Sequence, residues 1–152
     1  MTTIRLAEPK DWKQLAAMRA LLWPDASEQE HLGEFEADEL NGGQPDFPCV
    51  ALVAEEEHGE LIGFLEVGLR SHADGCDTRR PVGFVEGWFV REEHRGKGVG
   101  RELMGAADAW ARARGCLEMA SDALIDNSRS EIAHKAVGFE VVDRCVHFRK
   151  AL

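Results

Sequence analysis

A glycine-rich turn with basic residues follows an apolar segment near the middle of the chain. The segment is Phe84–Val90, and the turn reads Arg95-Gly96-Lys97-Gly98-Val99-Gly100-Arg101. Glycines let the backbone approach a ligand closely because they carry no Cβ atom. A helix beginning near Gly98 points unpaired N–H groups and the positive end of its dipole into the turn. This combination favours binding of a phosphate or pyrophosphate group.

The glycine spacing differs from two other phosphate-binding motifs. Dinucleotide-binding folds use Gly-x-Gly-x-x-Gly with an acidic residue about 20 residues later, and P-loops use Gly-Lys-Ser/Thr. Here the spacing is Gly-x-Gly-x-Gly, and Lys97 precedes Gly98. Spacing alone therefore leaves open a flexible turn that caps a helix, with a basic dinucleotide-binding module as a remote further alternative.

An acidic residue lies inside the apolar segment, where Glu86 stands between Val85 and Gly87. A carboxylate in a central strand must be paired, exposed in a cleft, or raised in pKa. The structural alternative to a catalytic role is a salt bridge to a neighbouring strand.

Two further acids stand near expected strand ends. Asp122 follows Met119-Ala120-Ser121, at the carboxyl end where α/β sheets place their ligands. Asp143 lies in the segment expected to form the last strand. The structural alternatives are a loop cap for Asp122 and an exposed pair with Arg144 for Asp143.

The apolar patterns predict the elements that position these residues. Helices are expected from Asp11 to about 22, and over about 28–40, 98–114 and 128–137; strands are expected over 3–7, 49–54, 61–69, 84–90, 118–120 and 141–148. The order β-α-α-β-β-β-α-β-α-β predicts an α/β (α+β) fold with a mixed sheet and helices on both faces. No linker or repeat divides the chain, so residues 1–152 are expected to form one domain.

The composition restricts the class of protein. With 44% hydrophobic and 30% charged residues, the chain is typical of a soluble globular domain. No apolar run approaches the roughly 20 residues of a membrane span. Met1–Arg5 lacks the pattern of a signal peptide, so a cytoplasmic location is expected. The four cysteines and six histidines show no metal-binding spacing, and no metal is expected.

The net charge of −10 argues against a nucleic-acid partner. It is compatible with a cationic small molecule or a basic peptide as partner, although charge alone favours simple solubility.

The turn and the C-terminal region together resemble the GCN5-related N-acetyltransferase (GNAT) family. The resemblance is carried by Arg95-x-x-Gly98-x-Gly100 after an apolar strand, and by Val137-Gly138-Phe139 with Asn127 upstream. It implies a GNAT fold in which the two middle strands of the sheet splay apart. It also implies that acetyl-CoA binds in the gap, with its pantetheine arm on the backbone of Trp88, Phe89 and Val90.

A closer resemblance, to bacterial aminoglycoside 6'-N-acetyltransferases, covers most of the chain. It is carried by Leu22-Trp23-Pro24, Asp74-Gly75-Cys76, Phe84-Val85-Glu86-Gly87, Met119-Ala120-Ser121-Asp122 and Gly138-Phe139-Glu140. The resemblance implies contacts to the aminoglycoside from Trp23, Glu86, Asp122 and Asp143, and a contact to acetyl-CoA from Asn127. His72 stands where relatives can carry a substrate-site tyrosine, and Asp143 where they can carry glutamate.

These assignments imply a mechanism. Acetyl transfer requires a neutral amine, and Glu86 is the expected base, directly or through water. A backbone N–H such as that of Val90 is expected to stabilise the charge on the acetyl oxygen. Many GNAT enzymes place a tyrosine near the leaving sulfur, but this chain contains no tyrosine. His134 stands at that position. It is expected to act as the acid, to line the pantetheine channel, or to be a helix residue packed on the sheet.

Two other functions stay open at this point, namely a GNAT enzyme acting on a peptide amine or polyamine, and a non-catalytic acyl-CoA-binding sensor. A homodimer is expected through the apolar segment Val141–Phe148, because relatives commonly pair through their C-terminal strands and an unpaired edge would otherwise be exposed.

Overall fold

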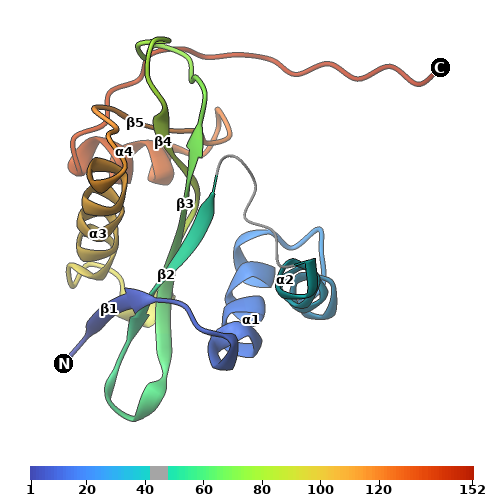
Figure 1. Ribbon diagram of the computed structural model, residues 1–152, viewed down its shortest axis with the longest axis vertical. Helices are drawn as coiled ribbons and strands as arrows, with labels where there is room; N and C mark the ends of the chain where they lie inside the picture. Colours follow the sequence, from blue (N-terminus) through green and yellow to red (C-terminus); the bar gives the residue numbers. More distant parts are fainter. Residues whose placement is uncertain (42–47) are drawn as a thin grey trace.

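The computed structural model describes residues 1–41 and 48–152 (Figure 1). The helices are α1 (Trp12–Leu22), α2 (Glu28–Asn41), α3 (Val99–Ala113) and α4 (Ser128–Ala136), and the strands are β1 (Thr3–Leu6), β2 (Cys49–Glu55), β3 (Leu61–Arg70), β4 (Val82–Val90) and β5 (Met119–Ser121). The second helix was expected to end at Gly42-Gly43, which lie outside the described residues. In the described part of the chain, no helix combines the length and apolarity needed to cross a membrane.

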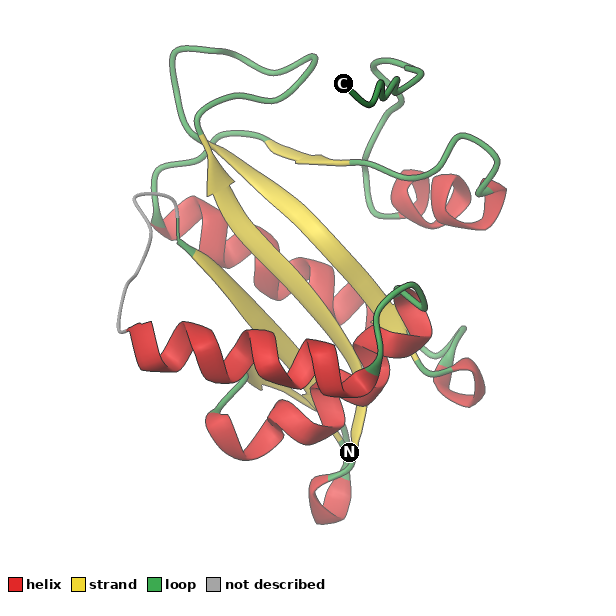
Figure 2. Cartoon of the chain, turned by 90° about the vertical axis from the view of Figure 1, so that its right-hand side faces the viewer, coloured by secondary structure: helices red, strands yellow, loops and turns green. Residues whose placement is uncertain are grey.

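The strands form one sheet in the order β1-β2-β3-β4-β5. The first four pair antiparallel with their neighbours, and β5 pairs parallel to β4. Helix α3 covers one face, while α1 and α2 lie on the other (Figures 1 and 2). The expected mixed sheet with helices on both faces is therefore confirmed.

Burial on both faces explains the long apolar runs of the central strands. Every residue of β3 from Leu61 to Gly68 is buried, because neighbouring side chains point to opposite faces and both faces are covered. On the α3 face, Leu65 and Val85 pack with a helical stripe that includes Leu103 and Ala107. The other face buries further strand residues beneath α1; its core is Leu15, Met18, Val53, Leu61, Phe64 and Phe89.

The predicted last strand, 141–148, is wrong. In the described residues β5 is the final strand, and Val141, Val142, Val146 and Phe148 are 46%, 60%, 72% and 93% exposed. The chain passes through α4 after β5 and then leaves the sheet as an extended tail (Figure 1). A strand needs a neighbouring edge for its backbone hydrogen bonds, and among residues 1–41 and 48–152 no strand pairs with the tail.

Candidate active site

Glu86 lies where the pairing of β3 with β4 slips by one residue. Glu66 pairs with Gly87 and Val67 pairs with Val85, so Glu86 has no partner on β3. Such a bulge bends the strand and redirects the side chain. Within β4, Glu86 is the exposed residue, with 37% of its side chain accessible. The bulge thus explains how an acid is accommodated in an apolar strand.

The Glu86 carboxylate pairs with Arg70 at the end of β3. The guanidinium donates from Nη2 to Oε1 and Oε2 at 2.8 Å each, and from Nε to Oε1 at 3.0 Å. The Cζ atom of Arg70 lies 3.5 Å from the ring centroid of Phe84. The salt bridge considered as a structural alternative is therefore present, and the carboxylate is also exposed. Sequence reasoning missed Arg70 because its backbone pairs with Val82, and only the folded sheet brings its long side chain to Glu86.

One edge of β4 is open beyond the bulge. The parallel pairing with β5 covers Gly83, Phe84 and Val85 and stops there, because β5 ends at Ser121. The edge from Glu86 to Val90 therefore has no β5 partner. This separation places the expected cofactor-binding backbone of Trp88, Phe89 and Val90 at an open edge. The Val90 carbonyl also accepts a hydrogen bond from Arg95 Nε at 2.8 Å.

The glycine turn connects this edge to α3. Gly96 and Gly98 have φ angles of 74° and 91°, in the left-handed region that favours glycine. A Cβ atom at either position would meet no atom within 4 Å. Gly100 has a different role, since its carbonyl accepts a hydrogen bond from Trp88 Nε1 at 3.1 Å and a Cβ there would lie 3.2 Å from the indole. Trp88 thus fixes the first turn of α3 to β4.

The basic residues of the turn have different surroundings. Arg95 lies near Phe89, with its Cζ atom 5.7 Å from the ring centroid. Arg101 Nη2 donates to the carbonyl of Ala136 at the end of α4, at 3.0 Å. Lys97 is exposed at the tip, and Val99 is buried as the first residue of α3. Two of the three expected phosphate-binding cations therefore also hold the turn in place.

Two predicted substrate residues adjoin the strand that carries Glu86. Asp122 follows Ser121, which pairs with Val85 in the parallel ladder, so Asp122 and Glu86 each come one residue after the last pair of that ladder. Trp23 ends α1 and lies against Gly87: a Cβ atom on Gly87 would be 2.5 Å from Cη2 of the indole. Only a glycine beside Glu86 leaves room for this ring.

Three other predicted site residues lie on exposed segments. His72 is in the loop after β3, with Nδ1 2.9 Å from the hydroxyl of Ser71. Asn127 caps α4, where its side-chain oxygen accepts from Ser130 N at 3.1 Å. Asp143 is in the C-terminal tail and accepts from the backbone N–H of Arg144 at 2.7 Å. The structure does not bring these three residues into contact with Glu86.

His134 joins α4 to β5. Its Nδ1 lies 2.7 Å from the carbonyl oxygen of Ser130, and its Nε2 lies 2.8 Å from the hydroxyl of Ser121. The Ser130 carbonyl can only accept, so Nδ1 carries a hydrogen. The Ser121 hydroxyl also lies 3.4 Å from the carbonyl oxygen of Val85, to which it can donate, so the contact at Nε2 has no assigned direction. The ring also makes edge contacts with Trp88 and Phe139, at centroid distances of 5.3 and 5.2 Å. Both ring nitrogens of His134 thus have hydrogen-bond partners within the protein. These contacts agree with the alternative in which His134 is a helix residue packed on the sheet.

A charge network whose core is the Arg19–Glu66 pair lies next to Trp23. Arg19 of α1 donates to Glu66 of β3 at 2.5 Å and to Glu34 of α2 at 2.8 Å, and its guanidinium lies over Phe35. Burial raises the pKa of the Glu66 carboxyl, and the hydrogen bond from Arg19 opposes that rise. Sequence reasoning missed this network, although an acid within the apolar run of β3 was a signal of it.

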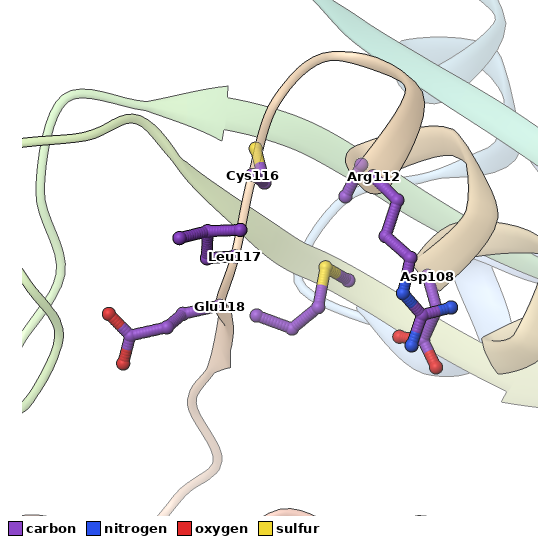
Figure 3. A pocket seen from close by; sticks show the side chains of 7 residues that line it. Asp108, Arg112, Cys116, Leu117 and Glu118 are labelled. Atoms are coloured by element: carbon purple, nitrogen blue, oxygen red, sulfur yellow. The ribbon is translucent and has the colours of Figure 1, made fainter.

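Two hollows adjoin α3 and its preceding turn. One of about 50 Å³ lies between the end of α3 and β5, where Asp108 and Arg112 face the segment from Cys116 to Glu118 (Figure 3). It contains none of the predicted site residues. The other, of about 310 Å³, is lined by Leu21, Phe89, Arg91, Glu92, Glu93 and Arg95. It therefore adjoins the glycine turn. No three metal-ligating side chains gather within the described ranges.

The separated β4–β5 pair and the glycine turn at its opening define an acyl-CoA-dependent transferase fold. The open edge offers backbone groups, and the two left-handed glycines leave space for a pyrophosphate, so these residues fit acetyl-CoA. The chain belongs to the acetyltransferase (GNAT) family, which it matches over residues 14–139. It is an acetyl-CoA-dependent N-acetyltransferase.

Relatives of similar length support this membership. The chain is 40% identical to an aminoglycoside N(6')-acetyltransferase type 1 of Stenotrophomonas maltophilia, over 99% of this chain and 94% of that protein. It is 42% identical to the protein of the same name from Klebsiella aerogenes, over 98% and 96%.

A solved structure also superimposes closely. The enzyme AAC(6')-Iy, in complex with the bisubstrate analogue CoA-S-monomethyl-acetylneamine, gives a TM-score of 0.87 at 33% identity and covers 100% of this chain and 99% of its own.

The turn assignment predicts that Gly98→Asp weakens acetyl-CoA binding, because it places a negative charge beside the pyrophosphate. We expect the Kd to rise about tenfold or more, equivalent to about 1.4 kcal/mol, in calorimetric titration. Gly115→Asp is the matched control: Gly115 has a φ of 84° and equally open space, but lies at the opposite end of α3. Equal affinities of the two variants would contradict the assignment.

Proposed function

We propose that the chain transfers the acetyl group of acetyl-CoA to the 6'-amine of aminoglycosides and thereby confers resistance to them. The observation that carries the proposal is the exposed Glu86 carboxylate at the bulge, beside the open edge of β4. The relatives named above act on aminoglycosides at this amine according to their names, and they match the chain almost end to end.

The charge and shape around Glu86 suit a polycationic sugar. Aminoglycosides carry several amines, which bind carboxylates through charge-assisted hydrogen bonds. Glu86 on β4 and Asp122 directly after β5 supply carboxylates, and Trp23 supplies an aromatic surface against Gly87, next to Glu86. The overall charge of −10 favours approach of such a cation. We also propose that Asp143 in the tail and His72 in the β3–β4 loop contact the aminoglycoside. Asn127, at the start of α4, is proposed to contact acetyl-CoA.

The proposed mechanism requires the substrate amine to lose a proton. Glu86 accepts it, directly or through one water, which typically accelerates a reaction by about 10²–10⁴-fold. Acetyl-CoA supplies an activated thioester when bound. The backbone N–H of Val90 stabilises charge on the acetyl oxygen. When the thioester C–S bond breaks, the CoA sulfur leaves as a thiolate and takes up a proton. His134 can supply that proton only if it gives up one of its two present hydrogen bonds.

Comparing substrates tests this function against its alternatives. We expect CoA release with aminoglycosides that carry a 6'-amine and none with counterparts that carry a 6'-hydroxyl, since the reacting nitrogen is then missing. Faster release with spermidine or a lysine-rich peptide would instead support a polyamine or peptide acetyltransferase. A chain that binds acetyl-CoA but releases no CoA with any amine would be a sensor.

We also propose that the chain forms a homodimer through its C-terminal tail. Val141, Val142, Val146 and Phe148 are exposed here, although apolar side chains usually lie buried. Pairing with the tail of a second copy would give this backbone a strand partner, which the described part of one chain does not supply. It would also cover these side chains and bring Asp143 to a fixed position.

Light scattering at micromolar concentration tests this assembly. We expect a mass twice that of the chain, and we expect Phe148→Asp to shift the equilibrium to monomer because it places a charge in the buried interface. Leu152→Asp, at the end of the chain, is the control and should leave the dimer intact. A monomeric wild-type chain would refute the proposal.

We place the reaction in the cytoplasm, where acetyl-CoA is made and used. Fractionation of expressing cells should recover the transferase activity with cytoplasmic markers, and recovery with periplasmic markers would contradict this location.

A further inference from the structure

We propose that Arg70 is a positioning residue that fixes the direction of the Glu86 carboxylate and presents one of its oxygens to the substrate amine. The inference rests on the proposed function, in which Glu86 accepts a proton. Arg70 itself is assigned no contact with the amine.

The hydrogen bonds between the two side chains are unequal. Oε1 of Glu86 accepts two of them, from Nε and Nη2 of Arg70, whereas Oε2 accepts one, from Nη2. A carboxylate has about four acceptor positions. The remaining position therefore lies on Oε2, and the planar guanidinium determines where it points.

Arg70 is itself held by the sheet. Its Cζ atom lies 3.5 Å from the ring centroid of Phe84. Phe84 is 6% exposed and pairs with Gly68 of β3 and with Ala120 of β5, so its ring has a fixed place in the sheet. Positional restraint therefore passes from the sheet through Phe84 and Arg70 to Glu86.

Glu86 needs such a restraint because of where it lies. The bulge leaves no residue of β3 directly opposite it in the backbone register, and 37% of its side chain is exposed, so its own strand does not fix its rotamer. Displacement of a catalytic group by about 1 Å can lower a rate by about 100-fold. The pair is 45% and 37% exposed, and such exposed pairs contribute little to folding stability. Its effect is therefore expected in catalysis.

The same geometry has a competing interpretation, in which Arg70 occupies Glu86 and must be displaced by the substrate ammonium group. Removing Arg70 would then lower KM for the aminoglycoside and leave kcat unchanged. Positioning predicts the opposite division: a lower kcat with no rise in KM.

A four-member cycle separates these interpretations. Wild type, Arg70→Gln, Glu86→Gln and the double variant are compared at saturating acetyl-CoA, with neamine as the varied substrate. We expect Arg70→Gln to lower kcat about 10- to 100-fold without raising KM. In the Glu86→Gln background, the same change should lower kcat by less than about twofold, because the carboxylate that Arg70 orients is already absent.

Three further variants serve as controls. Arg79→Gln removes the same charge from an exposed pair with Asp77 in the β3–β4 loop, and should leave kcat unchanged. Arg70→Lys keeps the charge but loses the planar fork, and should restore only part of the rate. Phe84→Leu keeps the strand apolar but removes the ring beneath Arg70, and should lower kcat. When it is combined with Arg70→Gln, the loss in kcat should be smaller than the two single losses added together.

The outcomes distinguish this inference from the proposed function. A wild-type chain that does not acetylate neamine, or a Glu86→Gln variant of normal rate, would overturn both. With an active wild type and an impaired Glu86→Gln, the inference alone is overturned by an Arg70→Gln kcat within about threefold of wild type, or by equal losses in both backgrounds.

Discussion

The one-residue slip between β3 and β4 is the constraint on which the site depends. With regular pairing, the residue at position 86 would face a partner on β3 and alternate with its neighbours between two covered faces. The slip leaves the backbone of Glu86 without a partner on β3 and exposes its side chain within an otherwise apolar strand. It occurs just beyond Val85, the last residue of β4 that pairs with β5. One irregularity thus coincides with both the carboxylate and the end of the β4–β5 pairing.

The rest of the fold keeps this irregularity in place. Apolar packing on both faces holds β3 and β4 as buried central strands, so a local break in pairing does not unravel the sheet. Trp88 ties the start of α3 to β4, and Trp23 fills the space above Gly87. The glycine turn at the start of α3 and the Trp23 ring are therefore both held against β4, the strand that carries Glu86.

Local patterns in the sequence were sufficient to predict the helices, the first five strands and the glycine turn. That Glu86 would be paired or exposed was also predictable, because an acid in an apolar strand requires an explanation. The ion pair between Glu86 and Arg70 was not predictable from local pattern, because it depends on the register of β3 against β4, which slips by one residue. The tail was wrongly predicted as a strand because Val141–Phe148 has strand composition, whereas a strand also needs an edge to pair with. The contacts of Asp143 and His72 depend on exposed segments that local pattern does not place.

The central claim is that the Glu86 carboxylate receives the substrate's reacting amine at the open edge of β4. A crystal structure of the chain with CoA and a 6'-amino aminoglycoside tests this most directly. The account predicts the 6'-nitrogen within about 3 Å of Oε2 of Glu86, or joined to it by one water, with the CoA sulfur beside the Trp88–Val90 edge. An amine bound elsewhere, with Glu86 still paired only to Arg70 and no water linking it to the substrate, would contradict it.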